Sequence, residues 1–418
     1  MGRSNRYPGL SSIRMGAAAF SLMLSFLGVV CGASTLPQAA PSTQAYGVQF
    51  SCLPSQLDHV SQDMSRYLQQ LGMPADLIQE TFDRAQGTVT YSLLGSKEGT
   101  STLSLGLRPE LSIQDEVVLL PAKNHKMRRV TTVSKKEVLL ALLHPGRLTK
   151  FKGKACEVQA LIDHVGVRQN TVLWTELLEW GWPEGGPAEW NVRYWRSGTP
   201  TPDVPLHEAL NDMFFQQGKY KMGCYAASKV VFAQGTLDYY RRVKRDPATA
   251  RTVERRLLSD KEPLVDLEPH RMWNFETDFD PLELQRPGKV LRLIDGVAAK
   301  NFVPGDWAYF LNTDLRTNQK TGYEGSNAVY LGRNRFDDYY NDNQHYYTYQ
   351  EKLNEVYQWR NDVFSRRRDF AKIQPLTAQD YERLSATPEN GGLVMDFRVA
   401  PYLFGYEDLP ELTGQPTD

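Results

Sequence analysis

The chain has 418 residues, of which 41% are hydrophobic and 23% are charged, and its formal net charge is −1. This composition is that of a globular protein and excludes a chain that is disordered throughout. Basic and acidic residues number 48 and 49, which excludes a strongly basic protein, so we expect no nucleic-acid partner. The basic run Arg366 to Arg368 is interpreted as a solvated helix end.

The N-terminal segment 1–33 has the layout of an export signal. Three arginines precede an apolar stretch from Met15 to Val30, and the small residues of CGAS follow. Cleavage after Ala33 would remove the segment; a lipid anchor at Cys31 and a retained transmembrane anchor are the alternatives. The apolar run is shorter than the roughly 20 residues that span a bilayer, and no later run is long enough. We expect an exported protein, periplasmic, at the cell surface or extracellular, with no membrane span beyond this segment.

Export changes what the four cysteines predict. Three remain once the signal segment is removed, and three cannot all pair within one chain. The economical arrangement in an oxidising compartment is a disulfide between Cys52 and Cys156, with Cys224 free. Three reduced, buried cysteines that act as small hydrophobic residues are the alternative.

The first part of the mature chain predicts a mixture of helices and strands. Residues 34–47 are rich in small residues and proline and are interpreted as a linker. Apolar residues recur at helical spacing from Leu57 to Leu71, and a second helix over 74–85 would complete a helical hairpin. The other elements expected here are strands at 88–94 and 116–120 and a helix ended by Pro145 and Gly146. We assign residues 48–150 to an N-terminal accessory region.

The second part is richer in aromatic residues and has the helix-then-strand order typical of an α+β domain. Alternation in residues 190–195 predicts a half-buried strand. Helices are expected at 205–218, 224–240 and 351–360, the second of them amphipathic, and strands at 290–296, 306–312 and 327–332. We assign residues 151–402 to one domain and residues 403–418 to a C-terminal tail.

Cys224 is a candidate nucleophile because it follows a glycine at the expected start of a helix. A thiol there faces unsatisfied backbone amides and the positive end of the helix dipole, both of which favour the reactive thiolate. Gly223 would permit a close backbone approach and leave room for a substrate. Strands that follow such a helix can bring a base to the sulfur across a cleft, as in papain-like enzymes. A buried structural cysteine is the alternative.

Four segments carry a family resemblance in the right order. They are YWR at 194–196, the stretch 220–232 around Cys224, PGDWAYFLNTD at 304–314 and GSNAVYLG at 325–332. From about Trp190 to Arg360 the chain resembles the bacterial spore-coat type of protein-glutamine gamma-glutamyltransferase, a small transglutaminase with a papain-like, NlpC-type core. The resemblance implies an α+β fold of this kind, with residues 151–402 as a transglutaminase-like catalytic domain.

Three positions depart from the pattern of that family. Its glutamate before the cysteine is replaced by Gly223, its catalytic glutamate falls at Ser326, and its histidine falls at Asp342. Glu324 lies two residues before Ser326, so period-two alternation would return its side chain to the same face of the strand.

The resemblance therefore implies that Cys224 acts with Glu324 or Asp342 as its acidic partner. His345 is a further candidate from the same tyrosine-rich loop, with a surface or stacking role as its alternative. The other alternative is that Ser326 marks a lost base and a silent site.

The activity implied by the resemblance is crosslinking of proteins through a thioester on Cys224. The partners would be protein substrates, one supplying a glutamine donor and the other a lysine acceptor. Ser326 and Asn327 would contact the substrate, while Trp195 and Trp307 would line a lysine channel or merely pack in the core. No cofactor and no metal are expected, because ligand spacings and phosphate loops are absent from the sequence. A papain-like amidase or peptidase and an inactive binding protein are the alternatives.

Overall fold

The computed structural model describes residues 46–404, except 97–99, 124–125, 185, 197–198, 260–290, 295, 342–345 and 365–369. The expected signal segment 1–33, nearly all of the linker 34–47, both Asp342 and His345, and the basic run 366–368 lie outside the described residues. Within the described part of the chain, no helix combines the length and the apolar character needed to cross a membrane.

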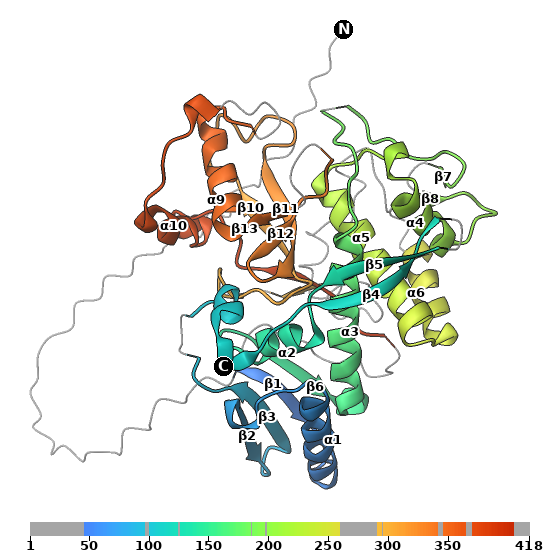
Figure 1. The fold of residues 1–418 in the computed structure, drawn as a ribbon, viewed down its shortest axis with the longest axis vertical. Helices are drawn as coiled ribbons and strands as arrows, with labels where there is room; N and C mark the ends of the chain where they lie inside the picture. Colours follow the sequence, from blue (N-terminus) through green and yellow to red (C-terminus); the bar gives the residue numbers. More distant parts are fainter. Residues whose placement is uncertain are drawn as a thin grey trace, which may run out of the picture. The chain divides into compact units, whose positions relative to one another are not determined.

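The first part of the chain forms a four-stranded sheet in the order β2-β3-β1-β6 (Figure 1). β3 is antiparallel to β1 and β2, and β1 is parallel to β6. The elements are β1 Gly47–Ser51, α1 Leu57–Gln70, β2 Ile78–Asp83, β3 Thr88–Leu93, β4 Glu116–Pro121, β5 Met127–Thr132, α2 Lys135–Leu143 and β6 Leu148–Lys152. β6 spans the boundary expected at residue 150, and that division of the chain stays a prediction.

The predicted helical hairpin is wrong. Residues Ala75–Leu77 form a single 3-10 turn, and β2 then pairs with β3 along its whole length. This pairing satisfies the backbone groups of an exposed segment that contains the β-favouring residues Thr81 and Phe82, and it overrides the weak helical pattern. The helix at 57–71, the strands at 88–94 and 116–120 and the helix ended by Pro145 are confirmed.

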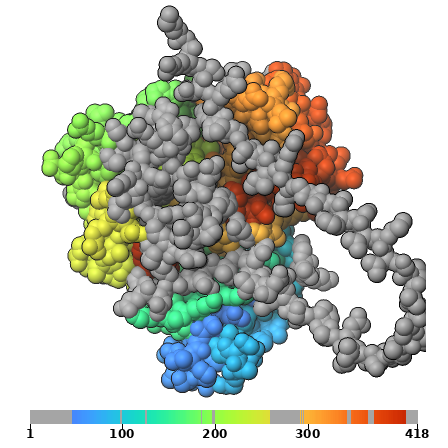
Figure 2. All heavy atoms as spheres, turned by 180° about the vertical axis from the view of Figure 1, so that it is seen from behind, coloured from blue at the N-terminus to red at the C-terminus, as the bar shows by residue number. Residues whose placement is uncertain are grey.

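The second part contains a six-stranded antiparallel sheet in the order β13-β12-β11-β10-β14-β9. The elements are α3 Val158–Thr175, β7 Trp195–Arg196, β8 Thr199–Pro200, α4 Leu206–Phe215, α5 Cys224–Asp238, α6 Pro247–Ser259, β9 Leu291–Ile294, β10 Trp307–Leu311, β11 Gly325–Gly332, β12 Arg335–Asp337, β13 Tyr346–Thr348, α9 Tyr349–Gln358, α10 Ala378–Leu384 and β14 Arg398–Pro401. The predicted α+β class is confirmed. Figure 2 shows from behind how the blue N-terminal residues adjoin the green residues that follow them.

Two expectations for the second part are wrong, and the helices α3, α6 and α10 were not anticipated. Only Trp195 of the strand expected at 190–195 lies in a strand, because the Asn191 side chain accepts a hydrogen bond from the Arg193 N–H (3.3 Å) and stabilises a turn. Helix α5 is not amphipathic, since every residue from Ala226 to Leu237 is buried. Helix α3 escaped prediction because its polar residues are buried together with its apolar ones, so no polar face marks it.

The side chains of β11 alternate between two hydrophobic clusters. Val329 and Leu331 pack with residues of α3 and α5, whereas Ala328 and Tyr330 pack with residues of α9. A strand sends successive side chains to opposite faces. Odd-numbered residues of β11 therefore face α5, and even-numbered residues face α9.

Asp306, directly before β10, is buried between two arginines. The Arg147 Nη1 atom lies 2.9 Å from Asp306 Oδ2, and the Arg168 Nη1 atom lies 2.8 Å from Oδ1. Burial alone would raise the pKa of Asp306, but the two guanidinium groups hold it below its ordinary value. The cluster joins β10 to α3 and to the N-terminal region.

Asp306→Asn is expected to lower the free energy of unfolding by about 3–5 kcal/mol, because two buried guanidinium groups lose their carboxylate. Urea unfolding at neutral pH measures the change. Since the pKa of Asp306 is lowered on folding, its contribution is present above the ordinary aspartate pKa and is lost as the pH falls through the folded value. Asp58→Asn, which breaks an exposed ion pair with Arg84, is the control and should change stability far less. Equal effects would contradict the prediction.

The predicted disulfide is confirmed. Cys52 and Cys156 are bonded, with Cα atoms 5.6 Å apart and a sequence separation of 104 residues. Cys224 is free, as expected.

Replacing Cys52 and Cys156 together by alanine is expected to lower the free energy of unfolding by about 2–5 kcal/mol, because the unfolded chain regains the entropy of a long closed loop. Urea unfolding without reductant measures the difference. Dithiothreitol should destabilise the unaltered chain and leave the double variant unchanged. A double variant as stable as the unaltered chain would show that the disulfide does not support the fold.

Candidate active site around Cys224

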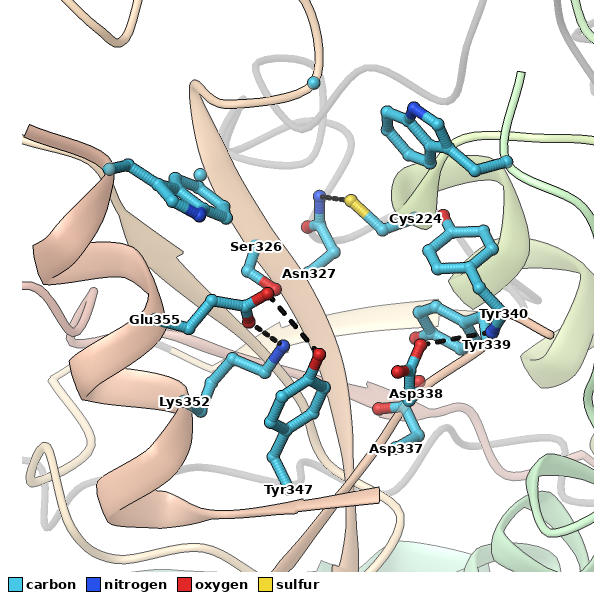
Figure 3. Close-up of a pocket in the computed structure, with 14 residues that line it drawn as sticks. Cys224, Ser326, Asn327, Asp337, Asp338, Tyr339, Tyr340, Tyr347, Lys352 and Glu355 are labelled. Carbon is cyan, nitrogen blue, oxygen red and sulfur yellow. Dashed lines mark hydrogen bonds and ion pairs between the residues drawn. The ribbon is translucent and has the colours of Figure 1, made fainter. Parts of the chain in front are cut away.

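Cys224 is the first residue of α5 and lines a pocket between this helix, the start of β11 and α9 (Figure 3). Aromatic side chains of the described lining include Trp182 and Tyr340, whose rings meet edge to face at 5.2 Å. Charged residues of the lining are Asp337, Asp338, Lys352 and Glu355. The pocket therefore sets a thiol opposite ionisable groups.

The sulfur of Cys224 receives a hydrogen bond from β11. The Asn327 Nδ2 atom donates to Cys224 Sγ at 3.4 Å, and the Trp307 Nε1 atom donates to Asn327 Oδ1 at 2.9 Å. The Trp307 ring packs against Tyr225, with ring centroids 5.3 Å apart. Asn327 is odd-numbered and so faces α5, and Trp307 fixes which end of its amide points at the sulfur.

Burial raises the pKa of the Cys224 thiol above its ordinary value. The Asn327 side chain and backbone N–H lower this pKa, the charge of Glu324 raises it and the charge of Lys352 lowers it, but burial dominates. The expectation that the helix start would leave a thiolate is therefore corrected. At neutral pH the resting site holds a protonated thiol, so the chemistry of this cysteine requires a base.

Gly223 is not a close-approach position. Its φ is −74°, and an added Cβ atom would meet only the Trp182 ring at 3.9 Å, an ordinary contact. The expected close backbone approach is therefore not seen, while the space beside the residue is open.

Ser326 and Asn327 both line the pocket, as expected of substrate contacts, but they lie on different faces of β11. Ser326 is even-numbered and faces α9. Glu324 lies in the turn before β11, where its Oε2 atom accepts the Gly322 N–H at 2.8 Å. Burial raises the pKa of Glu324. Glu324 is not among the described residues of the lining, so the pocket brings Cys224 together with Asn327 rather than with this carboxylate.

The two expected channel tryptophans do not line the pocket as the structure describes it. Trp195 is buried in the hydrophobic core at the short β7–β8 pair. Trp307 is buried behind Asn327 and positions its amide. Core packing, the alternative for both, is what the structure shows.

Sequence reasoning missed the ionisable residues that face Cys224 across the pocket. Lys352 Nζ lies 2.8 Å from Glu355 Oε2 and 3.9 Å from the centre of the Tyr347 ring. Burial would lower the pKa of Lys352, but the charges of Glu355, Asp338 and Asp337 raise it. The signal that could have found the two aspartates is their adjacency, Asp337 and Asp338, at the end of β12, one strand from β11. The pair in α9 has the spacing of a surface ion pair and gave no such signal.

A cysteine that begins a buried helix and faces an antiparallel sheet across a pocket is the arrangement that a papain-like cysteine enzyme requires. Residues 185–385 match the family model of protein-glutamine gamma-glutamyltransferase, which confirms the predicted resemblance and includes Cys224, Asn327 and Lys352. A transglutaminase from Geobacillus stearothermophilus, without its C-terminal extension, is a similar solved structure, with 16% identity, a TM-score of 0.35 and coverage of 58% of this chain and 93% of that chain. No curated protein matches the chain.

Asn327→Ala is expected to raise the pKa of Cys224 further, because a hydrogen bond that favours the thiolate is removed. Alkylation by iodoacetamide, followed by mass spectrometry, should then require a higher pH. Trp307→Phe should also move the alkylation of Cys224 to higher pH, but by less. The Asn327 amide remains in this variant and loses only the hydrogen bond from the indole. Asn390→Ala, at an exposed turn, is the control. A profile that stays in place in Asn327→Ala would contradict the role assigned to this amide.

Proposed function

We propose that this protein is an exported glutamine gamma-glutamyltransferase that joins glutamine and lysine side chains through a thioester on Cys224. The observation that carries the proposal is the Asn327 amide on the Cys224 sulfur, at a pocket within the segment that matches the transglutaminase family. The family supports an acyltransferase of this type. The thioester, the isopeptide product and export are our proposals.

In the first half-reaction Cys224 Sγ attacks the side-chain carboxamide carbon of a glutamine, ammonia departs and a thioester forms. The Asn327 Nδ2 atom, 3.4 Å from the sulfur, is close enough to donate to the carbonyl oxygen as it becomes negative. An acid must protonate the departing ammonia. Glu324 is the candidate that the sequence offers among the described residues, and Asp342 is the other.

In the second half-reaction a lysine amine attacks the thioester and releases Cys224. Among the described residues of the lining, the carboxylates of Asp337, Asp338 and Glu355 outnumber the ammonium of Lys352. This excess of negative charge favours the approach of a cationic lysine, which loses one proton to solvent before its neutral amine attacks. Aromatic residues of the lining limit the access of water, which would otherwise give glutamate.

The test is incorporation of a fluorescent primary amine into a glutamine-rich protein by the unaltered chain and by its Cys224→Ala variant. We expect labelling that depends on Cys224 and falls to background in the variant, because the variant lacks the atom that carries the acyl group. Far-UV circular dichroism checks that the variant is folded.

Three other results would contradict the proposal. Ammonia release without incorporation at high amine concentration identifies an amidase, and cleavage of the substrate backbone identifies a peptidase. Absence of both labelling and ammonia release identifies a catalytically silent relative that serves as a binding protein.

A further inference from the structure

The thiol of Cys224 is protonated at rest, so the site needs a group that accepts its proton. The Oε2 atom of Glu324 accepts the Gly322 N–H, and Glu324 is not among the described residues of the lining, although its charge acts on the thiol. The carboxylates that do line the pocket are the further candidates for the base.

Asp337 ends β12, the strand next to β11. Phe336 before it packs in the cluster on the α9 side, so by alternation Asp337 faces α5, as Asn327 does. Its Oδ1 atom accepts the backbone N–H of Val329, two residues beyond Asn327. Its Oδ2 atom is buried without a hydrogen bond of good geometry among the described residues, and the Tyr339 hydroxyl lies beside the carboxylate. One oxygen is thus anchored to β11.

The groups around Asp337 leave it able to gain and lose a proton near neutral pH. Burial raises its pKa to about 7, although the Val329 N–H, the charge of Lys352 and the Tyr339 hydroxyl lower it and the charge of Asp338 raises it. The Tyr339 hydroxyl lies 2.5 Å from Ser228 Oγ, and Ser228 Oγ donates to the Cys224 carbonyl at 2.9 Å. Tyr339 thus ties the strand end that carries Asp337 to the first turn of α5.

The arrangement of Asp338 differs in one respect. Its Oδ1 atom accepts the Tyr340 N–H at 3.1 Å, within its own loop, whereas Asp337 accepts the Val329 N–H of β11 (Figure 3). Asp338 therefore resembles Asp337 in charge and burial and differs from it in this backbone donor. It is the natural matched control.

We infer that Asp337 is the acid–base residue of this site and exchanges a proton with Cys224 and with the departing ammonia, an inference that rests on the proposed function. As Sγ bonds to the glutamine carbonyl carbon, the thiol proton passes to the Asp337 carboxylate. As the C–N bond breaks, Asp337 returns that proton to the nitrogen and ammonia leaves. The attacking lysine amine then gives a proton to Asp337, which passes it to Sγ as the C–S bond breaks.

The first experiment measures the rate of Cys224 alkylation by iodoacetamide against pH, by mass spectrometry. If a carboxylate exchanges a proton with the thiol, the alkylation rate should rise in two steps as the pH increases. The first step lies near pH 7, and the second lies at the higher pH where the cysteine itself titrates. Asp337→Asn should abolish the first step, Asp337→Glu should keep it and Asp338→Asn should keep it. Retention by Asp337→Glu would show that the step requires a carboxylate at this position.

Three results would overturn the inference: no step in the unaltered chain, a step that survives in Asp337→Asn, or a step that disappears in Glu324→Gln instead. This measurement does not depend on transferase activity. A step that depends on Asp337 in a chain that incorporates no amine would uphold the acid–base pair and refute the proposed function.

The second experiment measures amine incorporation. Asp337→Asn should lower the rate by about 100-fold or more, the usual contribution of a general acid–base group, and remove the acidic limb of the pH profile. Asp338→Asn should retain that limb, and Asp337→Glu should restore part of the rate. A rate in Asp337→Asn within a few-fold of the unaltered chain would overturn the inference.

Discussion

The buried carboxylate of Asp306 holds together the parts of the chain that make the site. It neutralises Arg147 from the N-terminal region and Arg168 from α3, and its backbone carbonyl accepts the Tyr330 N–H of β11 at 2.9 Å. The next residue is Trp307, and its indole N–H donates a hydrogen bond that orients the Asn327 side chain. The amide of Asn327 in turn contacts the Cys224 sulfur. A charge cluster with no chemistry of its own thus sets the start of β10, and through it the geometry of the thiol.

Hydrophobic clusters lie on both faces of β11, and the pocket contains the polar residues beside them, at the start of β11 and the end of β12. Asn327 reaches the sulfur from the α5 face, and Lys352 and Glu355 approach from α9. Because Cys224 and Lys352 are buried, neighbouring charges act on them strongly, and the pKa of each is raised above its ordinary value. The same burial that stabilises the fold therefore keeps the thiol protonated and makes a proton acceptor necessary.

Much of the fold could be predicted from the sequence, because most helices and strands carry a local pattern. Apolar spacing located α1, the glycine before Cys224 located the start of α5, and alternation located β10 and β11. Helix α3 and β2 could not be found in this way, since burial on all sides and pairing with β3 depend on distant residues. At the site the cysteine and the cystine pair were predictable. The bond from the Asn327 amide to the thiol and the place of Asp337 in the same pocket were not, because both depend on the pairing of β10, β11 and β12.

The order of residues along the chain has a consequence for how the protein reaches its final state. During synthesis Arg147 and Arg168 leave the ribosome 159 and 138 residues ahead of Asp306. Until that aspartate emerges, burying the two guanidinium groups would leave their charges without a carboxylate, which is strongly unfavourable. The final packing of α3 around Arg168 therefore depends on a residue made much later.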